Sequence, residues 1–198
     1  MLLNVQAIAL GSIKPQHILP FIAFVILLFS TEVAARSEFE TIKKSISANV
    51  IFLRHALAPG FGDPDNFNKG NCSTQRNLNN KGRLQARAIG DYLKKSNLRF
   101  SEILTSEWCR CIDTAKELNL GQWETFSGLN SFFQGYEKKS QVMDKLQKKL
   151  NSLGYSDLVL FVTHQVVILE QTGVAPRSGE MVLYNSITKQ KTPYIIDY

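Results

Sequence analysis

Short apolar runs alternate along the chain with stretches in which apolar residues recur at helical spacing, and this rhythm predicts alternating strands and helices. The runs at residues 49–53, 103–104 and 158–162 are typical of buried strands, and residues 181–184 and 194–196 are candidates for later strands. Helices are expected over 80–95, from Ser106 to Leu118, over about 142–153 and over 166–172. We therefore expect an α/β fold, a three-layer α/β/α sandwich with a mostly parallel central sheet covered on both faces.

Each predicted helix has an apolar stripe that should face the sheet. In the helix over 80–95 the stripe consists of Leu84, Ala88 and Tyr92, with Ile89 and Leu93 beside them. In the next helix Ser106 is the expected N-cap, and the stripe consists of Trp108, Ile112, Ala115 and Leu118. The third helix has a stripe from Val142 to Leu153, and its Lys145, Lys148 and Lys149 lie off that stripe on a face expected to be solvated.

Residues 1–35 have the pattern of a secretory signal peptide. They contain the basic residue Lys14, an apolar run over residues 18–29, and the small residues Val33, Ala34 and Ala35 at the cleavage positions. The run is shorter than the ~20 apolar residues that a membrane helix needs. We predict one domain over residues 36–198 in a periplasmic or secreted protein without a membrane span after cleavage; an uncleaved N-terminal membrane anchor is the alternative.

The composition indicates a globular protein. Of 198 residues, 44% are hydrophobic and 20% are charged, which excludes a disordered, collagen-like or coiled-coil chain. The formal net charge is +6 and the isoelectric point is about 9.2. This excess of positive charge suits an anionic ligand or a membrane surface. It is too small to indicate nucleic-acid binding, and we expect no nucleic-acid partner.

Three cysteines suit an exported protein. A bridge between Cys109 and Cys111 is disfavoured, because residues two apart on a helix point in different directions. Cys72 can pair with either of them, and three free or buried thiols are the alternative.

The two histidines of the predicted domain directly follow buried strands. His55 follows Arg54 at the end of the first run, and His164 follows Thr163 at the end of the third. Ligand sites of such sheets lie beyond the carboxyl ends of the strands, so both rings are candidates for one site. The chain has no CxxC or HExxH motif, and no metal is expected.

Three strings in this order support a family resemblance: Leu53-Arg54-His55-Ala56, then Ser106-Glu107-Trp108-Cys109-Arg110 with Asp113-Thr114-Ala115, then Val162-Thr163-His164. Over residues 49 to about 185 the chain resembles the histidine phosphatase superfamily, whose fold is that of phosphoglycerate mutases. The resemblance implies that His55 is the nucleophile and that Arg54, Arg110 and His164 complete a phosphate pocket, with no cofactor. Ala56 replaces the glycine of the family signature.

Elementary chemistry agrees with these roles. Arginine forks bind phosphate oxygens in pairs, and the start of the helix that carries Arg110 offers amides to an anion. A neutral His55 is a competent nucleophile, whereas we expect His164 to be cationic among the phosphate oxygens and to donate hydrogen bonds to them. For the proton donor we place Asp63 before Asp65, Glu107 and Glu180. The loop over 56–77 is long enough to be functional, and in it Arg76 is a candidate for the pocket mouth.

The sequence thus predicts an exported, metal-independent phosphatase that hydrolyses a phosphate monoester, phosphohistidine or sugar phosphate through a phosphohistidine on His55. Its expected partner is a phosphorylated small molecule or envelope component. If no side chain serves as the proton donor, substrates with good leaving groups, such as phosphohistidine or acyl phosphates, are favoured over alkyl phosphates. A phosphomutase and a catalytically silent phosphate-binding or envelope-interaction protein are the alternatives.

Overall fold

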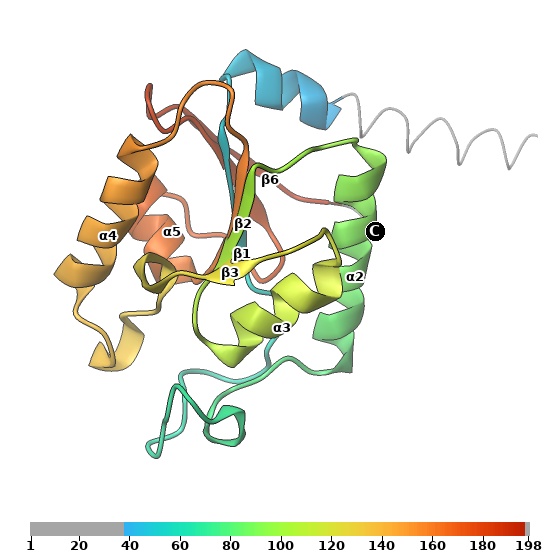
Figure 1. The fold of residues 1–198 in the computed structure, drawn as a ribbon. Helices are drawn as coiled ribbons and strands as arrows, with labels where there is room; N and C mark the ends of the chain where they lie inside the picture. The colour runs from blue at the N-terminus through green and yellow to red at the C-terminus, as the bar shows by residue number, and fades with distance from the viewer. Residues whose placement is uncertain (1–37, 197–198) are drawn as a thin grey trace, which may run out of the picture. The chain divides into compact units, whose positions relative to one another are not determined.

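In the computed structural model, which describes residues 38–196, a sheet of six strands lies at the centre of the fold (Figure 1). The strands are β1 (Val50–Arg54), β2 (Glu102–Thr105), β3 (Glu124–Thr125), β4 (Val159–Thr163), β5 (Met181–Tyr184) and β6 (Lys191–Tyr194), in the order β3-β2-β4-β1-β5-β6. The first four pair in parallel, while β5 runs antiparallel to β1 and to β6. The sheet is therefore mixed and mostly parallel, as predicted, with β5 and β6 as its antiparallel part.

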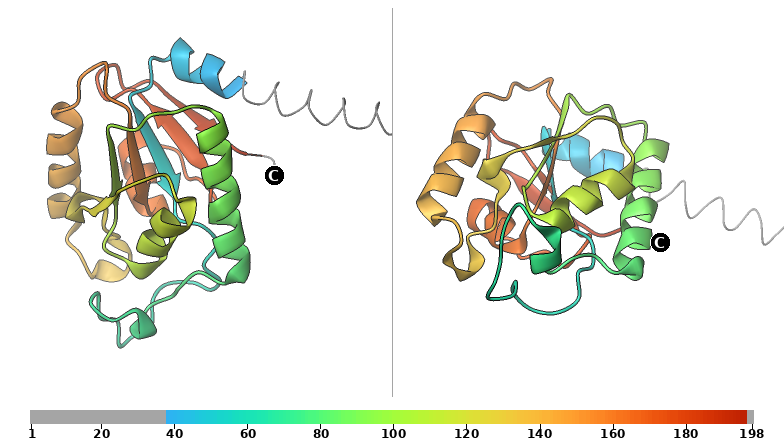
Figure 2. Two further views of the ribbon diagram at one scale, coloured as in Figure 1. Left: turned by 45° about the vertical axis from the view of Figure 1, so that its right-hand side comes forward. Right: turned by 60° about the horizontal axis from the view of Figure 1, so that its bottom comes forward.

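Helices cover both faces of the sheet, which confirms the three-layer α/β/α sandwich (Figures 1 and 2). The helices α2 (Asn80–Lys95) and α3 (Cys109–Leu118) pack on one face, and α4 (Lys139–Asn151) and α5 (Gln165–Thr172) pack on the other. Successive residues of each strand point to opposite faces. Ile51 and Leu53 therefore join the core under α2 and α3, whereas Val50 and Phe52 join the core under α4 and α5.

The buried face of α2 differs from the predicted stripe. Leu84 is 61% exposed, and glycines take its place beside the buried Ile89 and Leu93. A Cβ atom on Gly90 would lie 2.1 Å from the backbone oxygen of Leu118 in α3. The two helices thus approach closely through a residue without a side chain, and hydrophobic spacing does not reveal such a contact.

Two predicted boundaries were wrong. The helix α3 begins at Cys109 with Trp108 at its N-cap position, so Ser106 is not the cap. The Ser106 hydroxyl accepts from the Trp108 amide at 3.3 Å and also faces His164. The last strand, β6, ends at Tyr194, where the predicted strand begins, because an exposed edge strand with Lys191 needs no apolar pattern.

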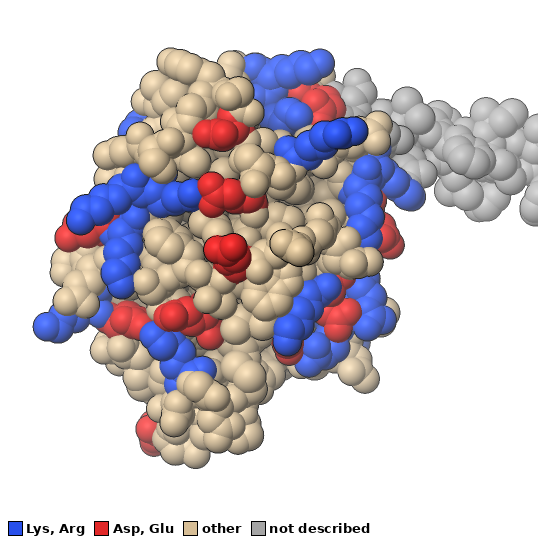
Figure 3. All heavy atoms as spheres, viewed as in Figure 1, with Lys and Arg blue, Asp and Glu red and all other residues tan. Residues whose placement is uncertain are grey.

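The lysine-rich face of α4 is solvated, as predicted, and part of its charge is paired. Lys145 and Lys148 are exposed, while Lys149 forms an ion pair with Glu102 of β2 at 2.6 Å. On the face of the molecule in Figure 3, basic side chains lie among acidic ones. Exposed positive charge is therefore not gathered into one patch on that face.

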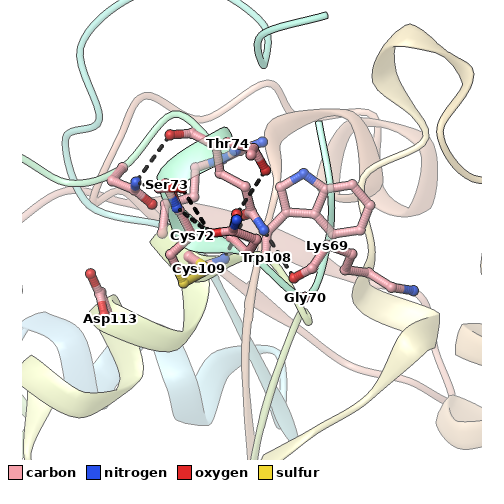
Figure 4. The surroundings of a disulfide bond; sticks show 12 residues. Lys69, Gly70, Cys72, Ser73, Thr74, Trp108, Cys109 and Asp113 are labelled. Atoms are coloured by element: carbon pink, nitrogen blue, oxygen red, sulfur yellow. Dashed lines mark hydrogen bonds between the residues drawn. A yellow bond between two sulfur atoms is a disulfide. The ribbon is translucent and has the colours of Figure 1, made fainter. Parts of the chain in front are cut away.

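A disulfide between Cys72 and Cys109 joins the long loop after β1 to the first residue of α3 (Figure 4). It spans 37 residues and settles the pairing left open above, while Cys111 is free and buried. The loop, which contains the short 3-10 helix η2 (Cys72–Thr74), lies beyond the carboxyl end of β1 (Figure 2). Within residues 38–196, no helix combines the length and apolar character needed to cross a bilayer. The predicted signal peptide lies outside the described residues.

Candidate active site

The register between β1 and β4 brings the two histidines together. Arg54 pairs with Thr163 across the parallel strands, and the next residue of each strand is a histidine. The His55 amide donates to Thr163 O at 2.9 Å, and the two buried imidazole rings lie 5.5 Å apart between centroids. The predicted meeting of these rings at one sheet edge therefore occurs.

Backbone geometry fixes the tautomer of His55. Its Nδ1 lies 2.8 Å from the carbonyl oxygen of Ala56. Because a carbonyl oxygen can only accept, Nδ1 carries the hydrogen and Nε2 keeps a lone pair. Burial, and then the positive charge of Arg110, hold the pKa of His55 well below its ordinary value. The ring is thus neutral near pH 7. Ala56 has no positive φ, so the signature glycine is not required here.

His164 is neutral as well in the protein alone; the cation was expected for His164 among phosphate oxygens. Burial and the charge of Arg110 hold its pKa well below the ordinary value. Its Nε2 lies 2.8 Å from the Ser106 hydroxyl, and Arg110 Nη2 approaches its Nδ1 at 3.5 Å. A guanidinium group only donates, so Nδ1 acts as the acceptor and Nε2 carries the hydrogen.

Arg54 and Arg110 line the pocket, and each has one buried nitrogen, Nε, without a hydrogen-bond partner among the described residues. Arg54 is anchored by a bond of 2.9 Å from Nη1 to Pro176 O, and Arg110 is anchored by Asp63. A buried donor without an acceptor is costly. Both guanidinium groups line the cavity, and their positive charge favours an anion there.

Asp63 does not have the surroundings of a proton donor. Its carboxylate accepts from Arg110 at 2.7 Å and 3.2 Å, from Trp108 Nε1 at 3.1 Å and from the Arg76 amide at 3.0 Å. Burial raises the pKa of Asp63, but the hydrogen bonds and charge of Arg110 outweigh burial and lower it overall. The group is ionised, and it is not among the residues that line the cavity.

Arg76 lines the pocket as expected for the loop residue at its mouth. Its Nε donates to Gly62 O at 2.9 Å, and its Nη1 donates to Ala58 O. Burial and the nearby Arg110 lower the pKa of Arg76 to about 10. Three guanidinium groups therefore share one small cavity and repel one another, which again favours a multiply charged anion.

The other predicted acids also lie off the cavity. Glu107 accepts from Lys69 at 2.8 Å and from Asn130 Nδ2 at 2.6 Å. Burial raises the pKa of Glu107, and the hydrogen bonds from Lys69 and Asn130 outweigh this and lower it. Neither Asp65 nor Glu180 lines the cavity. Within residues 38–196, no group of three or more His, Cys, Asp and Glu side chains is placed to hold a metal ion.

The start of α3 offers fewer amides to an anion than the sequence indicated. The Cys109 amide donates to Gln75 Oε1 at 3.0 Å, and the Trp108 amide donates to Ser106 Oγ. These two amides are thus occupied by side chains of the loop and of the segment before the helix. The positive charge of the pocket comes from its arginines instead.

The sequence missed part of the cavity wall. The residues that line it without having been predicted include Phe61, Ser131, Phe133, Gln165 and Val166. Trp108 is fully buried as expected, and its ring stacks on Phe67 at 5.1 Å. An exposed phenylalanine between two glycines, as in the string Gly60-Phe61-Gly62, was the available signal.

The arrangement can bind a phosphate group and attack it. The donors of Arg54, Arg110 and Arg76 surround the cavity, and His55 presents a neutral nitrogen with a lone pair. Fixed donors of this kind stabilise the charge on a phosphoryl group as it is transferred.

The sequence of the chain matches the model of one protein family. Residues 50–149 match the model of the histidine phosphatase superfamily (branch 1). No curated protein matches the chain significantly.

Solved structures of similar fold include phosphatases. The protein histidine phosphatase SixA, solved with tungstate, has a TM-score of 0.50 and 19% identity, over 74% of this chain and 94% of that chain. A mycobacterial glucosyl-3-phosphoglycerate phosphatase, solved with VO3, has a TM-score of 0.55 and 14% identity, over 75% and 98%. The protein TTHB049 from Thermus thermophilus has a TM-score of 0.53 and 14% identity, over 75% and 99%. At these identities the likeness establishes the fold.

Proposed function

Because the chain belongs to branch 1 of the histidine phosphatase superfamily, we propose that it is a phosphatase that hydrolyses a phosphate monoester through a phosphohistidine on His55. The family indicates phosphatase or mutase chemistry in general. The observation that carries the proposal is the tautomer of His55, whose Nε2 lone pair lies in a cavity lined by arginines.

In the first step His55 Nε2 attacks phosphorus and forms a P–N bond while the bond to the leaving group breaks. Arg54, Arg110 and Arg76 hold the phosphoryl oxygens, since their guanidinium groups already face one cavity. The negative charge of the substrate raises the pKa of the neighbouring His164, which then gains a proton and donates to an oxygen. Tungstate and vanadate in the two similar structures are oxyanions of related shape.

In the second step water attacks the phosphohistidine and releases inorganic phosphate. The P–N bond breaks and its electron pair returns to Nε2, while the oxygen and both hydrogens of the water go to the released phosphate, which then loses a proton to solvent; the neutral ring is restored. The Ala56 carbonyl holds the hydrogen on Nδ1 throughout. No other group need be consumed, because the product of one turnover is the starting ring of the next.

The leaving group departs without help from a carboxylic acid. None of the residues that line the cavity is acidic, and Asp63 is held as a carboxylate by Arg110. Substrates whose leaving groups are stable anions or weak bases, such as aryl phosphates, phosphohistidine or acyl phosphates, therefore suit the site better than alkyl phosphates.

We also propose that the protein acts outside the cytoplasm. Two observations support export: residues 1–35 have the pattern of a signal peptide, and the Cys72–Cys109 disulfide suits an oxidising compartment. Detection of the processed chain in periplasmic or culture fractions would test this.

The reaction is tested with 4-nitrophenyl phosphate on the wild type and on His55→Ala. We expect turnover and a wild-type protein that carries about 80 Da of added mass, one HPO3 group on a covalent adduct, which acid treatment removes. His55→Ala should show neither, while Tyr155→Ala, a change at an exposed residue that does not line the cavity, should behave as wild type. Undiminished turnover by His55→Ala would overturn the mechanism. A wild type that binds tungstate without turnover or adduct would support the phosphate-binding alternative instead.

A further inference from the structure

Two exposed aromatic rings form the outer wall of the pocket. Phe61 is 90% exposed and Phe133 is 38% exposed, and both line the cavity that contains His55. Their rings meet edge to face, with centroids 5.1 Å apart and planes at 85°. A phenylalanine ring in water lacks the stabilisation that burial would give. A ligand that covers these rings would supply it.

The backbone around Phe61 holds the ring outward. Phe61 lies between Gly60 and Gly62, whose φ angles are 95° and 67°, values that residues with a side chain rarely adopt. Arg76 Nε donates to Gly62 O at 2.9 Å. The ring therefore stands on a turn that is tied to an arginine of the phosphate pocket.

The segment of Phe61 is also tied to that of Phe133. The Asp63 amide donates to Gln134 Oε1 at 2.7 Å, and Gln134 Nε2 donates back to Asp63 O at 3.1 Å. Gln134 is the chain neighbour of Phe133, in the 3-10 helix η4 (Phe133–Gly135). The two rings are thus held as a pair, which lowers the entropy that a ligand loses on contact with them.

The remaining polar groups of the wall are partly engaged. Gln165 Nε2 donates to Pro176 O at 3.1 Å, and Ser131 Oγ accepts from the Phe133 amide at 3.2 Å. Recognition of a sugar needs several polar groups directed at its hydroxyls, whereas this wall presents Phe61, Phe133 and Val166. Its chemistry fits a flat apolar group.

We propose that Phe61 and Phe133 bind the ring of the leaving group, so that the substrate is a phosphate attached directly to an aromatic ring. The proposal rests on the phosphatase function proposed above and names its substrate class. As His55 Nε2 bonds to phosphorus, the P–O bond breaks and its electron pair leaves with the ring, as a phenolate. Such leaving groups need no acid from the pocket.

The experiment compares two substrates that need no acid and differ in the ring: 4-nitrophenyl phosphate and acetyl phosphate. We expect Phe61→Ala and Phe133→Ala to raise KM for the aryl substrate about five- to tenfold, the effect of losing an aromatic contact, with acetyl phosphate changed less than about twofold. Tyr155→Ala, which removes an exposed ring that does not line the cavity, is the matched control.

A binding measurement keeps the inference testable if the protein proves inactive. Phenylphosphonate and methylphosphonate are not hydrolysed, and calorimetric titration should give the wild type about fivefold tighter binding of the phenyl compound. The double variant Phe61→Ala/Phe133→Ala should bind both equally. Equal binding by the wild type, or variants that weaken both compounds alike, would overturn the role of the rings. Absent turnover with a retained phenyl preference would overturn only the phosphatase function.

Discussion

The Asp63 carboxylate accepts from both terminal nitrogens of Arg110, at 2.7 Å and 3.2 Å, and each of the two side chains is only 4% exposed. Asp63 comes from the loop after β1 and Arg110 from the second position of α3, 47 residues apart. The carboxylate of Asp63 thus fixes the orientation of the buried Arg110 guanidinium, whose Nε has no partner among the described residues. This relation makes Asp63 a positioning residue for the phosphate pocket.

Asp63→Asn should lower kcat/KM roughly ten- to hundredfold. Without the carboxylate, Arg110 shifts, and even a small misplacement of a group that holds the phosphoryl group slows its transfer strongly. The loss should be the same for 4-nitrophenyl phosphate and for phenyl phosphate, whose leaving group is more basic. Steady-state kinetics on the two substrates measures the ratio. A much larger loss on phenyl phosphate would instead identify Asp63 as the acid that protonates the leaving group.

The ion pair of Asp63 and Arg110 should make the free energy of unfolding depend on pH in the acidic range. The folded pKa of Asp63 is lowered, so its contribution is present above the ordinary pKa of 3.8 and is lost as pH falls through the folded value. Removing one partner of a buried pair costs about 3–5 kcal/mol, and we expect a loss of this order for Asp63→Asn at pH 7. Urea unfolding of variant and wild type should converge as the pH falls below 3.8. A constant difference at all pH values would contradict the pairing.

The two histidines should produce their own pH dependence nearer neutrality. Both folded pKa values lie well below 6.5, so below pH 6.5 the unfolded chain binds more protons than the folded one. The free energy of unfolding therefore falls as pH decreases, by on the order of 1 kcal/mol per pH unit for each histidine. Urea titrations from slightly alkaline to mildly acidic pH measure this slope. His55→Asn should reduce it by about half, and an unchanged slope would argue against a neutral buried ring.

The Cys72–Cys109 disulfide should contribute to stability through the 37 residues that it spans. For a loop of that size, constraint of the unfolded chain is worth about 4 kcal/mol. Cys72→Ser should lower the free energy of unfolding by that order, and a reductant should lower the wild type to the same level. Because the variant has no such bridge, the reductant should leave it unchanged; a further loss would mean that another bond carries the effect.

Gly90→Ala should destabilise the contact between α2 and α3. The added Cβ would lie 2.1 Å from Leu118 O, a backbone atom, and overpacking of this kind costs about 1–3 kcal/mol. An alanine in an open helix would stabilise instead. Gly154→Ala is the matched control, because its nearest neighbour is a side-chain atom at 3.7 Å. Thermal unfolding of both variants measures the difference, and Gly90→Ala should melt at the lower temperature. Equal melting temperatures would contradict the close approach of α2 and α3.

Local sequence patterns determined much of this protein. The apolar runs before His55 and His164 became β1 and β4, since a strand buried on both faces requires consecutive apolar residues. Because both histidines directly follow parallel strands, their meeting could be predicted without coordinates. The roles of Arg54 and Arg110 were implied by the family resemblance, which rests on short strings at the ends of predicted strands and at the start of a predicted helix.

Only the tertiary structure decided the relations between residues that are far apart in the chain. The ion pair of Asp63 with Arg110, the choice of Cys109 over Cys111, and the pairing of Phe61 with Phe133 depend on where one long loop lies. The neutral state of His164 depends on the combined burial and charge of that assembly. A periodic pattern records which side of a strand or helix is buried, whereas loop placement and electrostatic fields arise from contacts across the whole fold.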